Sequence, residues 1–304
     1  MVVWALSKYA CPPPYGAATR LFNLARNFQE NGHDTLLLTS DANHLASFPK
    51  SKKTYNHENI NGLRVCWIKT KKYSRTASIS RLLSWLDFEL KLFFLPRKSF
   101  RKPDVIIVSS LSLLSIIYGY FLKIKYKSAL VFEIRDIWPL TMTEEAGFSS
   151  WHPLVLLLGM VEKFGYKKAD LIVGTMPRLD LHVRKILGRD RPFFCSPLGY
   201  CKESLAALSK QAKPDLETYF PMDKIIVGYC GSMGISNALD TFIRCIEMLG
   251  DHPEVHFVLV GGGDLRSKYM KRLEPSANAT FVPRILPAEV PHFLALCDIL
   301  YLST

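Results

Sequence analysis

The sequence predicts an α/β protein of two Rossmann-like domains, each built on a parallel sheet, and three observations support this. Apolar runs of strand length alternate with segments of helical periodicity, which is the pattern of βαβ units. A polar, irregular stretch at 198–223 interrupts the alternation, which restarts at residue 224. The 304 residues, 48% hydrophobic and 22% charged, suffice for two domains with separate cores. We therefore expect an N-terminal domain at 1–197, a linker at 198–223 and a C-terminal domain at 224–304.

In the first domain, apolar periodicity predicts the strands and helices, and glycines mark where helices end. Strands are expected at 2–7, 35–39, 63–68, 105–108, 129–132, 169–173 and 193–196, and helices at 19–31, 80–95, 111–123, 152–168 and 177–187. Residues 41–62 are expected to form a polar loop. Between the first strand and the first helix lies a loop rich in proline that contains Gly16 and Ala17. Two small residues before a helix N-terminus permit close approach of an anion or a sugar, although a turn without ligand fits the same pattern.

The strand at 129–132 is followed by three charged residues, Glu133, Arg135 and Asp136. They stand where a buried parallel strand emerges at its carboxyl end, and open parallel sheets bind ligands outside those ends. These three residues are therefore candidate catalytic residues. The alternative is an Arg–Asp pair that only holds a loop in place.

The formal net charge of +12 is unevenly distributed, with eleven Lys/Arg and only two acidic residues between Arg64 and Lys102. The same region contains the helix at 80–95, whose polar residues Ser84, Asp87 and Lys91 form one narrow stripe. A soluble surface helix needs a wider polar face, so this helix is either deeply buried or lies in a membrane interface. We expect contacts to the membrane or to the acceptor from basic and aromatic residues near the helix, namely Lys71, Lys72, Trp85, Lys98 and Arg101.

The second domain repeats the strand–helix alternation. Strands are expected at 225–231, 255–260, 279–282 and 297–302, and helices at 237–249, 264–273 and 287–296. Two glycine loops, one with Gly231 and Ser232 and one with Gly261 and Gly263, each follow a strand and precede a helix. Backbone amides and the helix dipole at such positions can hold a phosphate, and two of them in consecutive units favour a nucleotide ligand.

The segment Phe132-Glu-Ile-Arg-Asp-Ile-Trp-Pro139 resembles the Arg-Asp-Leu-Trp-Pro segment of bacterial family-4 glycosyltransferases of the fucosamine-transferase type. The loop at 12–17 is similar to the Pro-Pro-x-x-Gly-Gly loop of that family, with Ala17 at the second glycine. The resemblance implies a GT-B-like fold, with two Rossmann-like domains facing each other across a cleft. It also implies that the Gly231 loop faces the donor diphosphate, that the Gly261 loop lies near the nucleoside and that Arg284 flanks the base.

The resemblance further implies an activity. It is the transfer of a hexosyl or N-acetylaminosugar group from a nucleotide diphosphate sugar, with retention of configuration, to a lipid-linked glycan acceptor. Such enzymes serve surface-polysaccharide or O-antigen synthesis, need no metal and sit peripherally on the inner face of the cytoplasmic membrane. Two departures bear on the site: Arg135 stands where many relatives have His, and Ser232 and Met233 stand where many have basic residues. The acceptor would be linked to polyprenyl pyrophosphate or be another glycan.

We also expect the second domain to be incomplete, because its fourth strand signal is the last and the family's Glu-x7-Glu-type motif is absent. An inactive remnant that binds a membrane or a partner is therefore an alternative function. A nicotinamide-dependent enzyme is disfavoured, because the first strand–loop–helix lacks Gly-x-Gly-x-x-Gly. Nucleic-acid binding has only the charge in its favour. Seven scattered cysteines without a Cys-x-x-Cys spacing indicate reduced, cytoplasmic thiols, and the histidines form no metal site.

Overall fold

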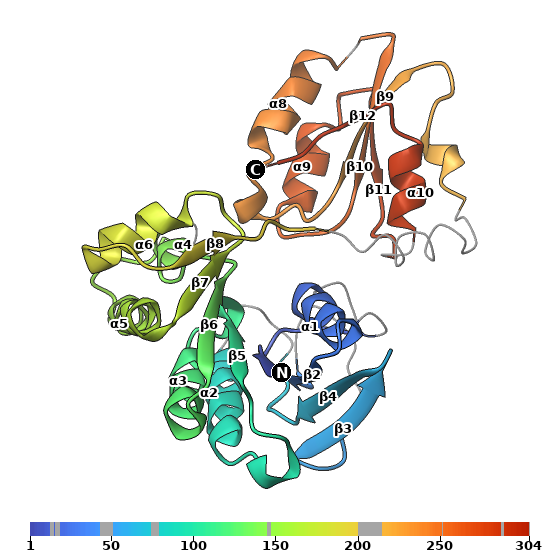
Figure 1. Cartoon of the computed structure of the whole chain (residues 1–304). Helices are drawn as coiled ribbons and strands as arrows, with labels where there is room; N and C mark the ends of the chain where they lie inside the picture. The colour runs from blue at the N-terminus through green and yellow to red at the C-terminus, as the bar shows by residue number, and fades with distance from the viewer. Residues whose placement is uncertain are drawn as a thin grey trace. The chain divides into compact units, whose positions relative to one another are not determined.

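The computed structural model describes residues 1–12, 15, 19–42, 51–73, 79–144, 147–199, 215–250, 252–286 and 289–303, with backbone only for Ile79, Leu111 and Ser236. The chain forms two compact units, Met1–Gly199 (unit 1) and Tyr200–Thr304 (unit 2) (Figure 1). Each unit has its own sheet and its own hydrophobic clusters, and each is described by itself below.

Unit 1 carries an eight-stranded sheet in the order β3-β4-β2-β1-β5-β6-β7-β8. Neighbouring strands are parallel except β3 and β4, which are antiparallel. The strands are β1 (Val2–Leu6), β2 (Asp34–Ser40), β3 (Tyr55–Ile60), β4 (Leu63–Ile68), β5 (Val105–Ser109), β6 (Ala129–Ile134), β7 (Leu171–Gly174) and β8 (Phe193–Cys195). Strand order reverses between β1 and β5, and doubly wound sheets bind ligands at such a switch point.

Helices cover both faces of this sheet, because its strands are apolar on both sides. The helices are α1 (Arg20–Glu30), α2 (Ile79–Phe93), α3 (Ser115–Tyr126), α4 (Leu140–Glu144), α5 (Pro153–Lys168) and α6 (Leu179–Leu187), with single 3₁₀ turns at Arg97–Ser99 and Ser110–Ser112. Alternate residues of β1 serve the two faces: Ala5 packs in the cluster that α1 completes, and Trp4 in the cluster of α2, α3 and α5. Figure 1 shows α1 on one side of the sheet and α2 and α3 on the other.

The predicted strands and the long helix at 152–168 are confirmed within a few residues, but the expected polar loop at 41–62 is wrong in its second half. Tyr55–Ile60 forms the edge strand β3, paired antiparallel with β4. Its sequence reads as a loop because an edge strand exposes most of its side chains. Glu58 anchors β3 to its neighbours, because its two carboxylate oxygens accept hydrogen bonds from the Tyr15 hydroxyl at 3.0 Å and from the Trp67 indole at 2.7 Å.

Helix α2 is neither deeply buried nor an ordinary surface helix. Its polar stripe faces inward: Ser84 is buried and donates to Thr70 at 3.5 Å, and Asp87 accepts the backbone N–H of Lys71 at 2.9 Å. Lys91 pairs with Asp87 at 2.7 Å and donates to the carbonyl of Lys69 at 2.8 Å. The stripe therefore binds the segment that follows β4. Phe88 and Leu92 are buried on the same inward side, whereas other leucines turn outward, with Leu86 45% and Leu90 60% exposed.

Unit 2 carries a four-stranded parallel sheet in the order β11-β10-β9-β12. The strands are β9 (Ile225–Cys230), β10 (Val255–Val260), β11 (Ala279–Val282) and β12 (Ile299–Leu300), and the helices are α8 (Asp240–Met248), α9 (Arg266–Arg272) and α10 (Val290–Ala295), with 3₁₀ turns at Glu217–Tyr219 and Ile235–Asn237. One cluster packs α8 and α9 against the sheet, and a second packs α10 and the segment at 216–220.

Strand β12 is short and lies at the edge of the sheet, paired only with β9 among the described strands. Its two residues stay about half exposed, at 53% for Ile299 and 52% for Leu300. Beside it lies an open apolar groove whose lining includes Val227, Phe242 and Tyr301. Among the described residues, the sheet therefore exposes apolar side chains next to β12.

Candidate functional site

The carboxyl ends of the parallel strands in unit 1 bring together residues that are far apart in the sequence. Lys8 follows β1, Ser110 follows β5, and Glu133 lies near the end of β6. The backbone N–H of Lys8 donates to the Ser112 hydroxyl at 3.0 Å, and the N–H of Arg135 donates to the Ser110 hydroxyl at 2.9 Å. The 3₁₀ turn after β5 thus connects the two sides of the switch point.

Glu133 is held in a buried ion pair with Arg20, the first residue of α1. The Arg20 Nε donates to Glu133 Oε1 at 2.9 Å, and the two side chains are only 11% and 2% exposed. The remaining guanidinium nitrogens donate to the carbonyl of Pro197 at 2.8 Å and to the carbonyl of Ser196 at 2.7 Å. Arg20 therefore ties α1 to β6 and to the segment after β8. This geometry gives Glu133 a structural task, and its catalytic role stays a prediction.

Arg135 and Asp136 lie in the bend that follows β6. The carbonyl of Arg135 accepts from Thr175 at 3.5 Å, and the carbonyl of Asp136 accepts from Ser110 at 3.4 Å. The backbone is thus fixed on both sides, while the Asp136 side chain is exposed and Arg135 is half-buried. Both residues follow β6 at the carboxyl edge of the sheet, and their catalytic role stays a prediction.

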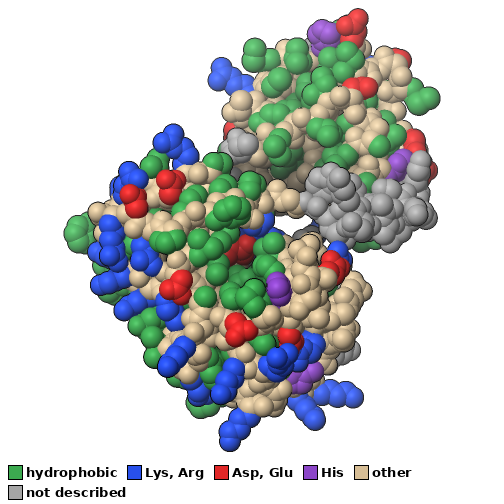
Figure 2. All heavy atoms as spheres, viewed as in Figure 1, with side chains coloured by type: hydrophobic (Ala, Val, Ile, Leu, Met, Phe, Trp, Pro, Cys, Tyr) green, Lys and Arg blue, Asp and Glu red, His purple; other side chains and the backbone are tan. Residues whose placement is uncertain are grey.

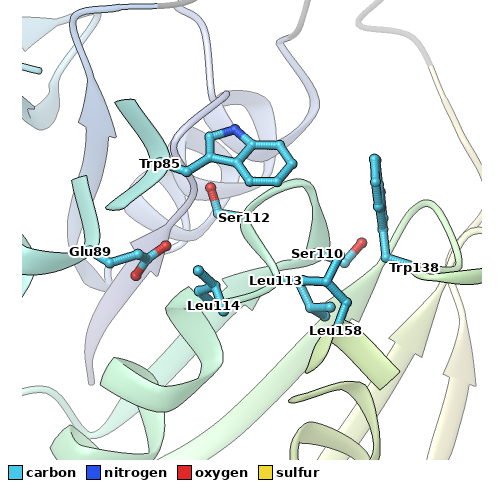
Figure 3. Close-up of a pocket in the computed structure, with 8 residues that line it drawn as sticks. All are labelled: Trp85, Glu89, Ser110, Ser112, Leu113, Leu114, Trp138 and Leu158. Carbon is cyan, nitrogen blue, oxygen red and sulfur yellow. The ribbon is translucent and has the colours of Figure 1, made fainter. Parts of the chain in front are cut away.

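A small hollow opens beside this bend (Figure 3). It is lined by two indoles, one carboxyl group, two hydroxyls and three leucines: Trp85, Trp138, Glu89, Ser110, Ser112, Leu113, Leu114 and Leu158. The rings of Trp85 and Trp138 meet edge to face, with centroids 6.0 Å apart and planes at 86°. Trp85 was predicted as a membrane or acceptor contact, and the structure brings it to the segment that carries Arg135 and Asp136.

Two buried ionisable groups, Lys8 and Glu89, lie in and next to the hollow. Lys8 is buried, and its ammonium donates to the carbonyl of Ala42 at 3.0 Å and to the Ser40 hydroxyl at 3.4 Å. Burial lowers the pKa of Lys8 to about 7, although the nearby Asp41 and Glu89 charges act the other way. Burial also raises the pKa of Glu89 to about 8, against a hydrogen bond from Ser115 and the charge of Lys8. Desolvation thus dominates at both groups and favours their neutral forms.

Sequence reasoning missed Lys8, Arg20 and Glu89 as members of this region. Lys8 carried one available signal, since a lysine directly after a buried strand interrupts an apolar run. Arg20 and Glu89 lie on helices whose orientation the sequence pattern does not fix. Their partners are 113 residues away for Arg20 and 26 residues away for Glu89, so only the fold reveals them.

The predicted contacts of the proline-rich loop and of the basic segments are placed as follows. Gly16 and Ala17 lie outside the described residues. Lys71 and Lys98 are exposed. Lys72 pairs with Asp41 at 3.1 Å, and Arg101 pairs with Asp34 at 3.1 Å.

In unit 2 the structure brings the predicted nucleotide-binding residues to one edge. Gly231 and Ser232 follow β9, Gly261 and Gly263 follow β10, and Arg284 follows β11. Because these three strands are parallel neighbours, all five residues lie at the same carboxyl edge of the sheet. Arg284 and Ser232 are exposed there.

The two glycine loops interlock. The N–H of Gly231 donates to the carbonyl of Val260 at 3.0 Å, and the N–H of Met233 donates to the carbonyl of Gly262 at 2.7 Å. Gly261 has φ +135°, and a Cβ there would lie 1.9 Å from the carbonyl oxygen of Gly231. These glycines therefore serve the contact between loops. The Gly231 amide is already used within the protein, whereas for the Ser232 amide a role toward a diphosphate stays a prediction.

The whole chain is similar to solved structures of one architecture. Sucrose-phosphate synthase from Thermosynechococcus elongatus is similar with a TM-score of 0.69 and 15% identity, over 100% of this chain and 76% of that one. Anabaena HepE in complex with UDP-glucose gives a TM-score of 0.59 and 14% identity, over 99% and 73%. WaaG, a glycosyltransferase involved in lipopolysaccharide biosynthesis, gives 0.59 and 16%, over 99% and 74%. The chain has a GT-B-like α/β fold, as the sequence predicts.

No protein-family model and no curated protein matches the sequence. The similarity therefore lies in the backbone arrangement and establishes the fold. What the chain does has to be argued from its own residues.

The interlocked loops predict a sharp contrast between neighbouring glycines. Gly261→Ala adds a Cβ that meets backbone at a φ that L-residues rarely adopt, and should lower the free energy of unfolding by about 2 kcal/mol or more. Gly262→Ala is the matched control, because nothing lies within 4 Å of its added Cβ. Urea unfolding followed by circular dichroism measures both. Equal stability of the two variants would contradict the loop contact.

The Arg20–Glu133 pair predicts coupled stability effects. Arg20→Met and Glu133→Gln should each cost about 3 kcal/mol, because the first leaves a buried carboxylate unpaired and the second leaves a buried guanidinium without its counter-charge. The double variant should cost less than the sum, with a coupling of about 1 kcal/mol or more. Arg26→Met on the same helix is the control, since it breaks the more exposed pair with Glu30 and should cost below about 1 kcal/mol. Additive single effects would show that the pair does not hold the two elements together.

Proposed function

We propose that this protein is a glycosyltransferase that uses a nucleotide diphosphate sugar. The observation that supports this most is the convergence of two glycine loops and Arg284 at the carboxyl edge of the unit 2 sheet. Anabaena HepE, of similar fold, has been solved with UDP and with UDP-glucose. In this proposal the diphosphate lies near the exposed Ser232, and Arg284 flanks the base.

The finer assignment follows the resemblance in the sequence to family-4 enzymes. The chain would transfer a hexosyl or N-acetylaminosugar group with retention to a lipid-linked glycan acceptor in surface-polysaccharide or O-antigen synthesis. The anomeric carbon exchanges its bond to the diphosphate oxygen for a bond to an acceptor hydroxyl oxygen, and the hydroxyl proton leaves to a base. Asp136, Arg135 and Glu133, at the carboxyl edge of the unit 1 sheet, are the candidate catalytic residues, and the reaction would need no metal. WaaG, described as involved in lipopolysaccharide biosynthesis, supports this class of pathway.

We further propose that unit 1 binds an anionic membrane surface, on the inner face of the cytoplasmic membrane, through its apolar helix face. This face consists of the exposed apolar side chains of three helices: Leu82, Leu83, Leu86, Leu90 and Phe93 of α2, Ile117 and Ile124 of α3, and Leu156, Leu157 and Met160 of α5. Helix α3 packs against both α2 and α5, so the face is continuous. Among the described residues no helix is long and apolar enough to cross a bilayer.

Basic residues accompany this face. Lys98, Lys125, Lys163 and Lys167 are exposed on or beside the same helices. Figure 2 shows hydrophobic and basic side chains interspersed on the side where α2, α3 and α5 lie. An apolar stripe with lysines around it is typical of helices that lie in a membrane interface. Each basic residue close to an anionic surface contributes about 1 kcal/mol.

The alternative function is a binding module without transfer activity. The exposed apolar face fits this module as well as it fits a membrane-bound enzyme. Nucleotide binding by unit 2 separates the two, because only the enzyme requires it.

Nucleotide binding is tested with Ser232→Glu, which adds a negative charge where the diphosphate is proposed. Gly231→Glu is less suitable, because a Cβ there would lie 2.6 Å from the Tyr229 hydroxyl and packing would change too. Ser232→Glu should weaken UDP binding by roughly tenfold or more, because like charges meet. Met248→Glu adds the same charge at the far end of α8, with Met248 78% exposed, and should bind as the parent does. Calorimetric titration with UDP decides, and equal affinity of all three proteins contradicts the site.

Membrane binding is tested by flotation with vesicles of anionic lipid. The double variant Leu86→Ser/Leu90→Ser should remove most of the bound fraction. The double variant Lys98→Glu/Lys163→Glu should do so too, and its loss of binding should be larger at low salt, where charges are screened less. Leu181→Ser on α6 and Lys185→Glu with Lys271→Glu on the two units are controls of equal chemistry. Lys72 and Arg101 are left unchanged because their ion pairs would be lost as well. Vesicle binding that is unchanged by salt and by the α2 substitutions would contradict membrane attachment through this face.

A further inference from the structure

An open basin of about 460 Å³ lies on unit 1 away from the candidate catalytic residues. Arg64 is the second residue of β4 and pairs in register with Leu36 near the start of β2. The basin therefore belongs to the amino ends of these strands, whereas Glu133 and Asp136 belong to the carboxyl edge. Its size is within the range of ligand pockets, about 300 to 1,000 Å³. The lining includes two apolar and four polar side chains: Leu36, Phe100, His57, Asn59, Arg64 and Ser99.

Phe100 is an apolar wall of this basin, and its ring is held by its neighbours. The ring meets that of Trp4 with centroids 5.8 Å apart and planes at 79°, and that of His57 at 5.5 Å and 61°. The Trp4 indole N–H donates to the carbonyl of Arg101 at 3.2 Å, which ties the chain after Phe100 to β1. Walls that are held before a ligand binds lower the entropic cost of binding.

Two arginines at the basin are held together by one carboxylate. The Asp34 side chain pairs with Arg64 through one oxygen and with Arg101, at 3.1 Å, through the other. Both arginine side chains stay accessible, at 44% and 72% exposed. A guanidinium has five N–H donors, so a pair with Asp34 leaves donors for a ligand. Three further basic residues stand in the segment at 97–102, which contains no acidic residue: Arg97, Lys98 and Lys102.

The other acidic groups at this end of unit 1 already have donors. Glu58 lines the basin, but both its carboxylate oxygens accept the hydrogen bonds that anchor β3. The Asp104 carboxylate accepts the backbone N–H of Val2 at 2.7 Å. In contrast, the side chains of Asn59 and Ser99 have no hydrogen bond to another described residue. The basin thus presents donors beside a net positive charge, which favours an anionic ligand.

We propose that this basin binds a phosphate group, carried either by a soluble phosphate ester or by a phospholipid headgroup. The oxygens of a phosphate can accept from Arg64, Asn59 and Ser99 together, whereas a carboxylate has only two oxygens. The Phe100 ring suits the carbon chain of the ester. A lipid source fits the surroundings, because α2 of the apolar helix face ends just before the segment at 97–102 and the intervening Phe94 is 77% exposed.

Calorimetric titration of the full chain with sn-glycerol 3-phosphate tests the soluble source. Glycerate is the counterpart, because it carries a carboxylate instead of the phosphate ester. We expect saturable binding of glycerol 3-phosphate that weakens as salt is added, because the charges are then screened. Glycerate should bind roughly tenfold more weakly, because it satisfies fewer donors. Tighter binding of glycerate than of the phosphate ester overturns the inference.

Substitution of Asn59 gives the sharpest contrast. Asn59→Asp keeps the side-chain shape but exchanges a donor for a negative charge, and should weaken phosphate binding by roughly tenfold or more. Asn27→Asp is the control of equal shape and charge: it is exposed on α1, which packs on the other face of the sheet, and it keeps the oxygen that accepts from Asn31 at 3.2 Å. Arg64→Gln should also weaken binding, whereas Arg184→Gln, which breaks another exposed pair with an aspartate, should not.

Flotation with phosphatidylglycerol vesicles tests the lipid source with the same variants. If the headgroup is the ligand, Asn59→Asp should lose roughly half of the bound fraction or more, and Asn27→Asp should bind as the parent does. The inference stands if Asn59→Asp, and not its control, loses binding of glycerol 3-phosphate or of the vesicles, and the affected assay identifies the source. It is overturned if the two variants behave alike in both assays, or if neither probe binds.

The same variants separate this inference from the proposed function. UDP binding is assigned to unit 2, so Asn59→Asp should bind UDP as the parent does. A chain that binds UDP but shows no effect of Asn59→Asp on either phosphate probe refutes the basin alone. A chain that loses phosphate binding in Asn59→Asp but binds no UDP in its parent form refutes the donor site alone.

Discussion

The buried pair of Arg20 and Glu133 is the interaction on which the ligand-binding edge of unit 1 depends. Parallel strands end together at one edge, but nothing in the backbone ladder fixes the helices and connections that leave it. Arg20 begins α1 and also holds the end of β6 and the carbonyls after β8. A guanidinium suits this task because its donors point in several fixed directions at once. A lysine could offer its charge to Glu133 but could not bind both carbonyls in the same geometry.

The orientation of α2 follows from a second constraint, the polar contacts that its narrow stripe makes with residues 69–71. A helix normally turns its polar side to water and its apolar side to the core. Here Ser84, Asp87 and Lys91 have partners inside unit 1 beside the buried Phe88 and Leu92, so that Leu82, Leu83, Leu86 and Leu90 are exposed. Trp85 meets Trp138 of the segment after β6, and both line the hollow together with Glu89. One helix thus contributes both to the apolar helix face and to a wall of the hollow.

In unit 2 the same glycines carry two interpretations, and the structure separates them. Gly261 and Gly263 have positive φ and allow one loop to lie against the backbone of the other. A glycine loop after a strand is therefore not evidence of a phosphate by itself, because close backbone approach has a structural reason here. The nucleotide assignment rests instead on where the loops meet, at an edge that they share with the exposed Ser232 and Arg284.

The sequence by itself determined most of the strands, most of the helices and the two-domain α/β class, because those depend on local periodicity and on glycine and proline positions. It also marked Arg135, Asp136 and the glycine loops, since residues after buried strands converge at one edge in any parallel sheet. It did not predict β3, whose polar sequence becomes a strand only when β4 offers it hydrogen-bond partners. It did not predict the partners of Arg20 and Glu89, because these contacts join residues distant in sequence. Which side of α2 faces the core was decided by tertiary contacts, which combine the packing of Phe88 and Leu92 with the polar contacts of Ser84, Asp87 and Lys91.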